Sequence, residues 1–262
     1  MKRFKDQVVW ITGASSGAGE ALVYEFDAEG AILIISARRE NELERVKNNC
    51  SRPNEVTVLP LDLEKHDTLK QIAEKAVKRY GKIDLLFNNG GISQRALASE
   101  TSPDVDKRLM NVNYLGAVHL TKAVLPHMLK RKQGHIAVMT SLTGKFGAPY
   151  RSAYAASKHA LHGFFDSLRS EVHHLNIEIT LVVSGYISTS IAENAFDGSG
   201  KSTQKKDVNI DGGMSPKVFA KKTIQGIFKN KNEITLGGKE KLGVYINRFF
   251  PALFAKIVRK QL

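Results

Sequence analysis

The feature that most constrains the fold is a regular alternation of short apolar runs with longer helical patterns. The runs are rich in β-branched residues and are continuously apolar, which is typical of strands buried on both faces of a parallel sheet. Helical patterns such as Thr68–Tyr80 and Val105–Arg131 lie between them. This order predicts right-handed crossovers and a doubly wound α/β fold, a Rossmann fold with a parallel sheet of six to seven strands in a single domain. The expected strands are Val8–Thr12, Ala31–Ala37, Val56–Leu61, Asp84–Phe87, His135–Thr140 and Glu178–Val183, with Ile234–Leu236 as a candidate seventh.

Charge and cysteine content narrow the classes of function. The net charge of +13 favours partners such as phosphates, nucleic acid or anionic membrane. No basic run has interleaved aromatic residues, so we expect no nucleic-acid partner. The single cysteine, Cys50, excludes an intrachain disulfide and a thiolate metal cluster. The first apolar run, Val8 to Ile11, is too short for a signal-peptide core or a membrane span, so we expect a cytoplasmic protein, with membrane association left open.

A glycine-rich turn follows the first expected strand and opens a helix. Its sequence runs from Thr12 to Gly19 with the spacing Gly-x3-Gly-x-Gly. Glycines let the backbone approach a pyrophosphate closely, and the helix N-terminus offers free N–H groups and the positive end of a dipole. The turn therefore predicts a dinucleotide site. The residues expected to hold the cofactor here are Gly13, Ser15, Ser16, Gly17, Ala18 and Gly19.

The second expected strand ends without a carboxylate. Enzymes of this architecture that use NAD usually place an acidic residue there, to bind the ribose 2′-hydroxyl. Here Arg38 and Arg39 follow Ser36-Ala37 instead. Arginine matches a 2′-phosphate in charge and in fork geometry, so the pair predicts NADP(H). The alternative is that both arginines simply begin a solvated helix.

Two polar residues, Tyr154 and Lys158, are four apart in the run Tyr-Ala-Ala-Ser-Lys. On a helix, such residues share a face. A phenol beside an ammonium group is a plausible acid/base for proton exchange with a carbonyl or an alcohol, because a nearby positive charge favours the phenolate. The pair alone is weak support, since an exposed helical turn can carry the same residues.

Taken together and in order, these motifs resemble the short-chain dehydrogenase/reductase family up to about Leu236. Asn113 resembles that family's catalytic asparagine, and Ser141 closes the fifth expected strand thirteen residues before Tyr154. Segments such as Lys132 to Ile136 resemble the dehydrogenase/reductase member 7B branch. The resemblance also adds cofactor contacts at Asp62, Leu63, Asn89, Gly90, Gly185, Ile187 and Thr189, besides Tyr154 and Lys158.

The resemblance implies a role for each catalytic residue. Tyr154 would exchange the proton with the substrate oxygen, and Ser141 would donate a hydrogen bond to that oxygen. Lys158 would bind the nicotinamide ribose and lower the pKa of Tyr154, and Asn113 would hold a water linking Lys158 to solvent. No metal is expected, since hydride would pass directly between nicotinamide and carbon.

The sequence departs from the family's pattern at two positions. Gly90 stands where the family has an alanine, which should loosen the strand end slightly. Ser184 stands where the family has a proline before Gly185. Serine restores a backbone donor and conformational freedom, so the loop along the nicotinamide could be held less tightly.

The last third of the chain carries the expected substrate features. A glycine-rich polar stretch, about 194–215, is expected to be a mobile loop that closes a substrate pocket, and Ser215-Pro216 should begin the next helix. Apolar groups near Leu142, Phe146, Tyr186, Ile191 and Phe196 should line that pocket, with few charges besides Lys145 and Arg151. We therefore expect an apolar ketone or alcohol substrate.

Residues 241–262 form a basic amphipathic segment that follows a dinucleotide-binding and catalytic domain of residues 1–240. Apolar residues from Ile246 to Ile257 recur at helical spacing among basic ones, and Pro251 interrupts them. Packing over the cleft or against a second subunit is favoured over contact with a membrane surface. We expect a homodimer or homotetramer. The alternatives to an enzyme are a nucleotide-binding scaffold and a peripheral membrane protein.

Overall fold

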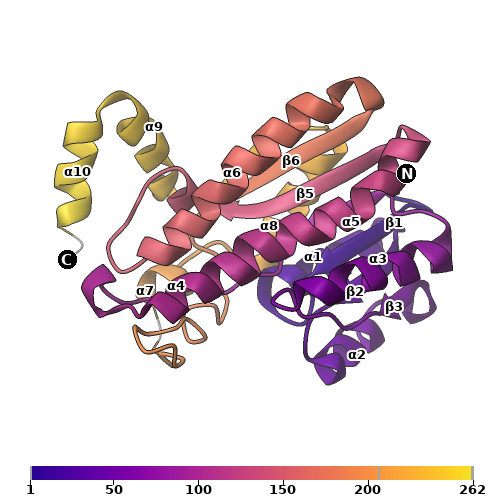
Figure 1. Ribbon diagram of the computed structural model, residues 1–262, viewed down its shortest axis with the longest axis horizontal. Coiled ribbons are helices and arrows are strands. Elements are labelled where there is room, and N and C mark those ends of the chain that lie inside the picture. The colour runs from indigo at the N-terminus through magenta and orange to yellow at the C-terminus, as the bar shows by residue number, and fades with distance from the viewer. Residues whose placement is uncertain (1, 206, 261–262) are drawn as a thin grey trace.

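The computed structural model describes residues 2–205 and 207–260, and it contains a seven-stranded sheet. The strand order is β3-β2-β1-β4-β5-β6-β7, and every neighbouring pair is parallel, which confirms the expected fold and the seventh strand. Figure 1 shows the strands with helices on both sides. The strands are β1 Val8–Thr12, β2 Ile32–Ser36, β3 Val56–Val58, β4 Leu85–Asn88, β5 Gly134–Ser141, β6 Ile177–Ser184 and β7 Glu233–Leu236.

Two hydrophobic layers cover the two faces of the sheet. One layer contains side chains of α1, α2 and α8, and the other contains those of α3, α5 and α6. All five residues of β1 are buried, because the strand lies between β2 and β4 with helices on both faces. The helices are α1 Gly17–Ala28, α2 Glu40–Asn48, α3 His66–Tyr80, α4 Pro103–Leu109, α5 Gly116–Arg131, α6 Ser152–Val172, α7 Val208–Asp211, α8 Pro216–Phe228, α9 Leu242–Phe249 and α10 Pro251–Arg259.

Most elements begin and end within two residues of the expected ranges, and two elements differ from them by more. Strand β3 ends at Val58 instead of Leu61, although the backbone N–H groups of Leu59 and Leu61 still donate to the carbonyl oxygens of Ile35 and Ala37 at 3.0 and 3.1 Å. The helix expected over Val105–Arg131 is interrupted by a π-helical turn at Met110–Leu115, which separates α4 from α5. Such turns cannot be read from apolar spacing, because the helical pattern continues on both sides of them.

The segment after β6 crosses the carboxyl end of the sheet. Phe196 forms β-bridges with Gln94 and Ser202, and the short helix α7 follows. The hydroxyl oxygen of Ser215 accepts a hydrogen bond from Val218 N at 3.3 Å, so this serine caps α8 as expected. Whether the loop moves stays a prediction.

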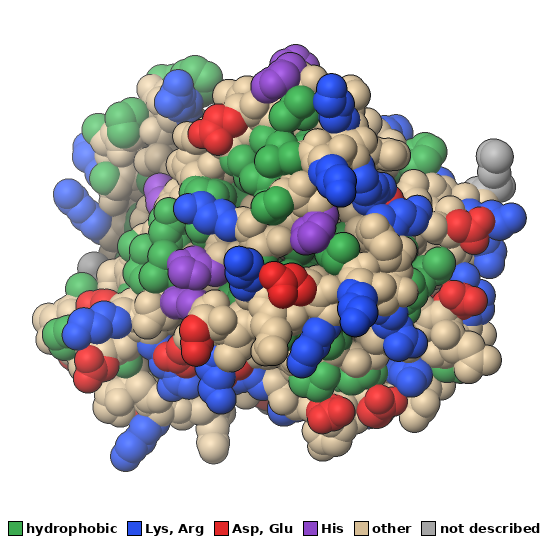
Figure 2. Space-filling model, turned by 45° about the vertical axis from the view of Figure 1, so that its right-hand side comes forward, with side chains coloured by type: hydrophobic (Ala, Val, Ile, Leu, Met, Phe, Trp, Pro, Cys, Tyr) green, Lys and Arg blue, Asp and Glu red, His purple; other side chains and the backbone are tan. Residues whose placement is uncertain are grey.

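The C-terminal segment forms α9 and α10, which lie at the opposite end of the molecule from the N-terminus in Figure 1. Within residues 2–205 and 207–260, no helix combines the length and the apolar character that a membrane span requires. Figure 2 shows one face of the molecule, on which basic and acidic side chains are interspersed and do not form a single basic stripe.

Candidate active site

A cavity of about 1250 Å³ opens at the carboxyl ends of the strands. In open α/β sheets, this is the edge at which ligands bind. The cavity extends from the glycine-rich turn, past Tyr154, to the C-terminal helices. It is lined by every site residue expected from the sequence except Asn113, namely Gly13, Ser15, Ser16, Gly17, Ala18, Gly19, Arg38, Arg39, Asp62, Leu63, Asn89, Gly90, Ser141, Tyr154, Lys158, Gly185, Ile187 and Thr189.

The turn between β1 and α1 requires glycine for steric reasons. Gly13 and Gly17 have φ of +64° and +59°, in the left-handed region that other residues rarely adopt. A Cβ atom on Gly19 would lie 2.1 Å from the carbonyl oxygen of Gly13. The side chain of Ser16, the N-cap of α1, makes no capping hydrogen bond among the described residues. The first-turn N–H groups are therefore not capped by this side chain, as an anion site requires.

Thr12 and Asn89 hold this turn against the end of β4. The Thr12 hydroxyl accepts hydrogen bonds from the backbone N–H groups of Asn89 at 3.1 Å and Gly90 at 3.0 Å. The Asn89 amide donates to the carbonyl oxygens of Thr12 and Gly13 at 3.0 and 3.2 Å. The sequence pointed to Asn89 as a cofactor contact; the structure shows that it also fixes the backbone of the turn.

Arg38 and Arg39 are exposed beside this turn and line the cavity. The Arg39 guanidinium donates to the Ser15 hydroxyl at 3.4 Å, which links the end of β2 to the glycine-rich turn. Asp62 lines the cavity after β3, and its carboxylate accepts a hydrogen bond from Glu64 N at 3.0 Å. This end of the cavity therefore carries two guanidinium groups, those of Arg38 and Arg39, directly after β2. Strand β2 itself ends without a carboxylate.

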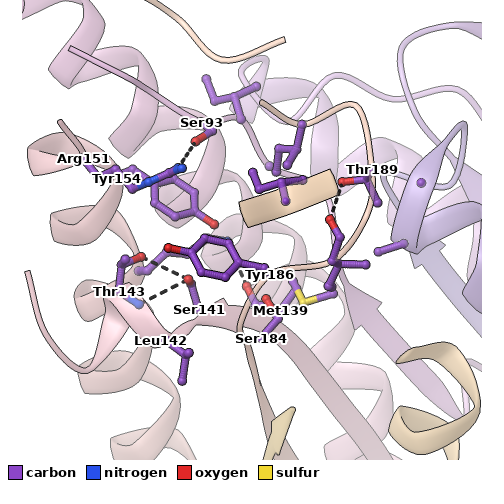
Figure 3. Close-up of a pocket in the computed structure, with 18 of the residues that line it drawn as sticks. Ser93, Met139, Ser141, Leu142, Thr143, Arg151, Tyr154, Ser184, Tyr186 and Thr189 are labelled. Carbon is purple, nitrogen blue, oxygen red and sulfur yellow. Dashed lines mark hydrogen bonds between the residues drawn. The ribbon is translucent and has the colours of Figure 1, made fainter. Parts of the chain in front are cut away.

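The catalytic candidates come from β5 and α6. Ser141 is the last residue of β5, and Tyr154 and Lys158 lie one turn apart on α6. In Figure 3, Ser141, Tyr154 and Tyr186 point toward one region of the cavity. The Ser141 Oγ accepts hydrogen bonds from the backbone N and the hydroxyl of Thr143 at 3.2 and 3.0 Å. Lys158 is buried, and its Nζ donates to the carbonyl oxygen of Met139 at 2.9 Å.

Burial and two nearby polar groups act on the pKa of Tyr154. Burial raises the pKa of its phenol, while the Arg151 guanidinium and a hydrogen bond with Ser141 lower that pKa. Arg151 is therefore the cation that opposes the effect of burial. The Lys158 Nζ lies 5.6 Å from the centre of the Tyr154 ring, and burial lowers its own pKa to about 8. That Lys158 lowers the pKa of Tyr154 when the cofactor is bound stays a prediction.

Asn113 lies behind the cavity, in the π-helical turn. Its amide donates to the Ile92 carbonyl and to the Ser157 hydroxyl, both at 3.0 Å, and its oxygen accepts from Ile92 N at 2.8 Å. The residue is 1% exposed, and these hydrogen bonds join the loop after β4 to α6. Its role in holding a water stays a prediction.

An ionic cluster at the cavity was missed by sequence reasoning, apart from Arg151. The Asp207 carboxylate pairs with Arg95 and, at 3.3 Å, with Arg151. Arg151 also donates to the Ser93 hydroxyl at 3.3 Å. The cluster joins the loop after β4, the start of α6 and the segment after β6. Because Arg95 and Asp207 are 112 residues apart, no local motif signals their pairing.

The expected substrate residues also line the cavity. They are Leu142, Phe146, Tyr186, Ile191 and Phe196, together with Leu242, Gly243, Ile246, Phe254, Ile257 and Val258 from the C-terminal segment. Arg151 lines the cavity as well, whereas Lys145 forms an ion pair with Glu233 at 2.6 Å. The C-terminal segment therefore packs over its own cleft, one of the arrangements favoured from the sequence.

Both departures from the family's pattern are accommodated. A Cβ atom on Gly90 would lie 2.7 Å from Leu63 Cδ1, so glycine here makes room for the leucine. The Ser184 hydroxyl donates to the Thr140 carbonyl at 3.2 Å, and Gly185 N donates to Leu236 O at 2.6 Å. The strand end is thus held by hydrogen bonds without a proline. No group of His, Cys, Asp or Glu suited to a metal ion occurs among the described residues.

Comparisons with known proteins agree with this geometry. Residues 7–200 match the short chain dehydrogenase family. A "Dehydrogenase/reductase SDR family protein 7-like" from Drosophila melanogaster is 43% identical, over 99% of this chain and 83% of its own length. Member 7B of that family from Bos taurus is 37% identical, over 97% of this chain and 81% of its own.

A solved structure shows the same fold. The short chain dehydrogenase/reductase from Burkholderia phymatum, in complex with NAD, superposes with a TM-score of 0.85 and 22% identity, over 97% of this chain and 96% of the other. The sequence resemblance to the family is confirmed. The chain belongs to the short-chain dehydrogenase/reductase family and is an oxidoreductase that uses a nicotinamide cofactor.

Proposed function

We propose that this protein is an NADP(H)-dependent oxidoreductase that interconverts a carbonyl and a secondary alcohol on an apolar substrate. The single observation that carries the cofactor preference is the pair Arg38 and Arg39, which line the cavity directly after β2, where no carboxylate stands. A 2′-phosphate would accept charge-assisted hydrogen bonds from these guanidinium groups. A 2′-hydroxyl would find no carboxylate at the end of β2.

The residues along the cavity fit a dinucleotide. The first turn of α1 and the glycines before it would hold the pyrophosphate. Lys158, Gly185 and Thr189 also line the cavity and would hold the nicotinamide end. When bound, the nicotinamide supplies or accepts a hydride.

The protein's own groups handle the proton. Tyr154 would donate its phenolic proton to the substrate oxygen, which Ser141 would orient through its hydroxyl. Because burial raises the pKa of Tyr154, the phenol keeps its proton at neutral pH. That state is the one required for reduction of a carbonyl, whereas oxidation of the alcohol would require the phenolate to accept the proton.

Apolar side chains favour an apolar substrate. Leu142, Phe146 and Ile191 line the cavity beyond the catalytic residues, and the C-terminal helices add further apolar groups. Each Å² of apolar surface that a ligand buries there contributes about 25 cal/mol. Long-chain or polycyclic ketones would gain more from this lining than small polar carbonyls.

Two measurements test the proposal. Arg38→Ala should weaken NADPH binding by about 1.5–3 kcal/mol, the range for a hydrogen bond to a charged group, and should leave NADH binding nearly unchanged. Arg79→Ala, on an exposed arginine of α3 that does not line the cavity, is the matched control.

The second measurement follows NADPH oxidation with long-chain or polycyclic ketones and with small polar carbonyls. We expect kcat/KM to favour the apolar set. Equal affinity of the unmodified protein for NADH and NADPH would exclude the cofactor assignment. A clear preference for the polar carbonyls would exclude the substrate assignment.

A further inference from the structure

Helix α9 presents an apolar face to solvent. Leu242, Tyr245 and Phe249 follow one another at i, i+3 and i+7, so they lie on one side of the helix. Their exposed fractions are 59%, 62% and 70%. Exposure of three large apolar side chains in one row is costly in water, which indicates that another surface covers this face.

Helix α10 continues the same feature. Phe250, Leu253 and Ile257 repeat the i, i+3, i+7 spacing and are 63%, 52% and 42% exposed. Six of the nine large apolar side chains exposed among the described residues therefore lie on α9, on α10 or between them. We call these six residues, Leu242, Tyr245, Phe249, Phe250, Leu253 and Ile257, the C-terminal apolar face.

The segment that carries this face is strongly basic. Residues 237–260 contain six cations against one carboxylate, Glu240. Glu240 accepts hydrogen bonds from the backbone N–H groups of Gly238 at 2.9 Å and Tyr186 at 3.3 Å, so it is engaged within the fold. The six cations are Lys239, Lys241, Arg248, Lys256, Arg259 and Lys260.

We propose that the C-terminal apolar face binds the surface of an anionic lipid bilayer. A helix lies in the membrane interface when apolar side chains on one face enter the lipid and cations beside them meet anionic headgroups. A second copy of this chain is a poorer fit, because two such segments would bring their positive charges together.

The same helices connect this face to the cavity. Leu242 and Ile257 of the C-terminal apolar face also line the cavity, together with Ile246 and Phe254. The Phe254 ring lies 4.7 Å from that of Phe146. Asn247 Nδ2 donates to the Lys145 carbonyl at 3.2 Å and fixes α9 to the turn after β5. Binding to a bilayer would therefore place this end of the cavity beside the lipid, although the proposed binding requires no cofactor or substrate.

The test is cosedimentation of the full chain with phosphatidylcholine vesicles prepared with or without phosphatidylserine. We expect binding to the anionic vesicles only. Phe249→Ser/Phe250→Ser should weaken it about tenfold or more, because two large apolar groups are lost. Arg248→Gln/Lys256→Gln should weaken it about fivefold for each cation, the equivalent of about 1 kcal/mol each.

Phe228→Ser is the matched control, because Phe228 is 53% exposed but lies at the end of α8. It should bind vesicles like the unmodified protein. Thermal melting and NADPH binding of each variant establish that it is folded. The proposal is overturned by equal binding to both kinds of vesicle, by no binding, or by a control that fails like the tail variants. A different outcome is that Phe249→Ser/Phe250→Ser dissociates a dimer, as measured by light scattering, and leaves vesicle binding unchanged. That outcome would show that the C-terminal apolar face binds a second copy of the chain.

Discussion

The two sides of the cavity are built differently. The cofactor side, around Gly13 and Gly19, is fixed by backbone geometry, with Thr12 and Asn89 joining neighbouring strand ends. The substrate side is held by side chains from distant segments, chiefly the pairing of Asp207 with Arg95 and Arg151. The cofactor side should therefore tolerate few substitutions. Substitutions on the substrate side can change which ligand binds without disturbing the sheet.

The largest effect on turnover should come from a change at Tyr154, which lies between the cofactor side and the substrate side. Tyr154→Phe should lower turnover by about 10²–10⁴-fold, because it removes the proton that general acid catalysis requires. The affinity for NADPH should change little, because the ring remains. Steady-state rates and fluorescence titration measure the two quantities.

Tyr186→Phe is the matched control for that experiment, since Tyr186 also lines the cavity and burial also raises its pKa. It should retain most of the turnover. If Tyr186→Phe lost activity and Tyr154→Phe kept it, the proton donor would be Tyr186.

The rigidity of the cofactor side is tested by Gly19→Ala. The added methyl group would lie 2.1 Å from the Gly13 carbonyl oxygen, so the turn must shift. Overpacking of this kind costs about 1–3 kcal/mol, and we expect weaker cofactor binding together with a lower Tm. Calorimetry and thermal melting measure both.

Gly163→Ala is the control for this change. Gly163 lies within α6, where an added methyl group would meet nothing within 4 Å. Alanine should stabilise the helix by about 0.5–1 kcal/mol. Unchanged cofactor binding in Gly19→Ala would mean that the turn is less rigid than its geometry indicates.

The substrate side should respond to Asp207→Asn. Loss of this charge leaves Arg95 and Arg151 without their shared carboxylate, so the segment after β6 should be held less tightly. We expect KM for the carbonyl substrate to rise severalfold, about 1 kcal/mol, with the Kd for NADPH nearly unchanged. Asp197→Asn is the control, because within the part of the chain that the structure describes the Asp197 carboxylate is hydrogen-bonded only to its neighbours Ser199 and Lys201. An equal loss of cofactor affinity in Asp207→Asn would contradict the separation of the two sides.

The smallest effect concerns pH. His162 is buried under the turn after Ser141, both its ring nitrogens lack partners among the described residues, and burial lowers its pKa to about 4. In the unfolded chain His162 binds a proton near pH 6.5, whereas in the folded chain it stays neutral at that pH. The contribution of neutral His162 to the free energy of unfolding is therefore fully present above pH 6.5. It should fall as the pH drops from 6.5 towards 4, where the folded chain also begins to bind the proton.

His162→Leu should reduce this pH dependence in urea unfolding. His174→Leu, at an exposed position in the turn that follows the same helix, should leave it unchanged. An unaltered slope in His162→Leu would show that another group is responsible.

Features that depend on local spacing could be predicted from the sequence, whereas features that depend on contacts between distant segments could not. The glycine-rich turn, Arg38 and the Tyr154–Lys158 pair depend on local spacing, and the structure places all of them at the cavity. The π-helical turn at Asn113 and the ionic cluster at Asp207 depend on contacts between distant segments. A single sequence without those contacts gives no signal for either.

The strand order has a consequence for synthesis of the chain. Strand β1 pairs with β4, so Val9 cannot pair with Leu85 until Leu85 has left the ribosome. The centre of the sheet cannot form before then. Sequence-distant pairing of this kind slows folding and leaves strand edges unprotected meanwhile. The residues that cover the cavity, from Tyr186 to Val258, are made last. The nascent protein can therefore form its glycine-rich turn before it can enclose a ligand.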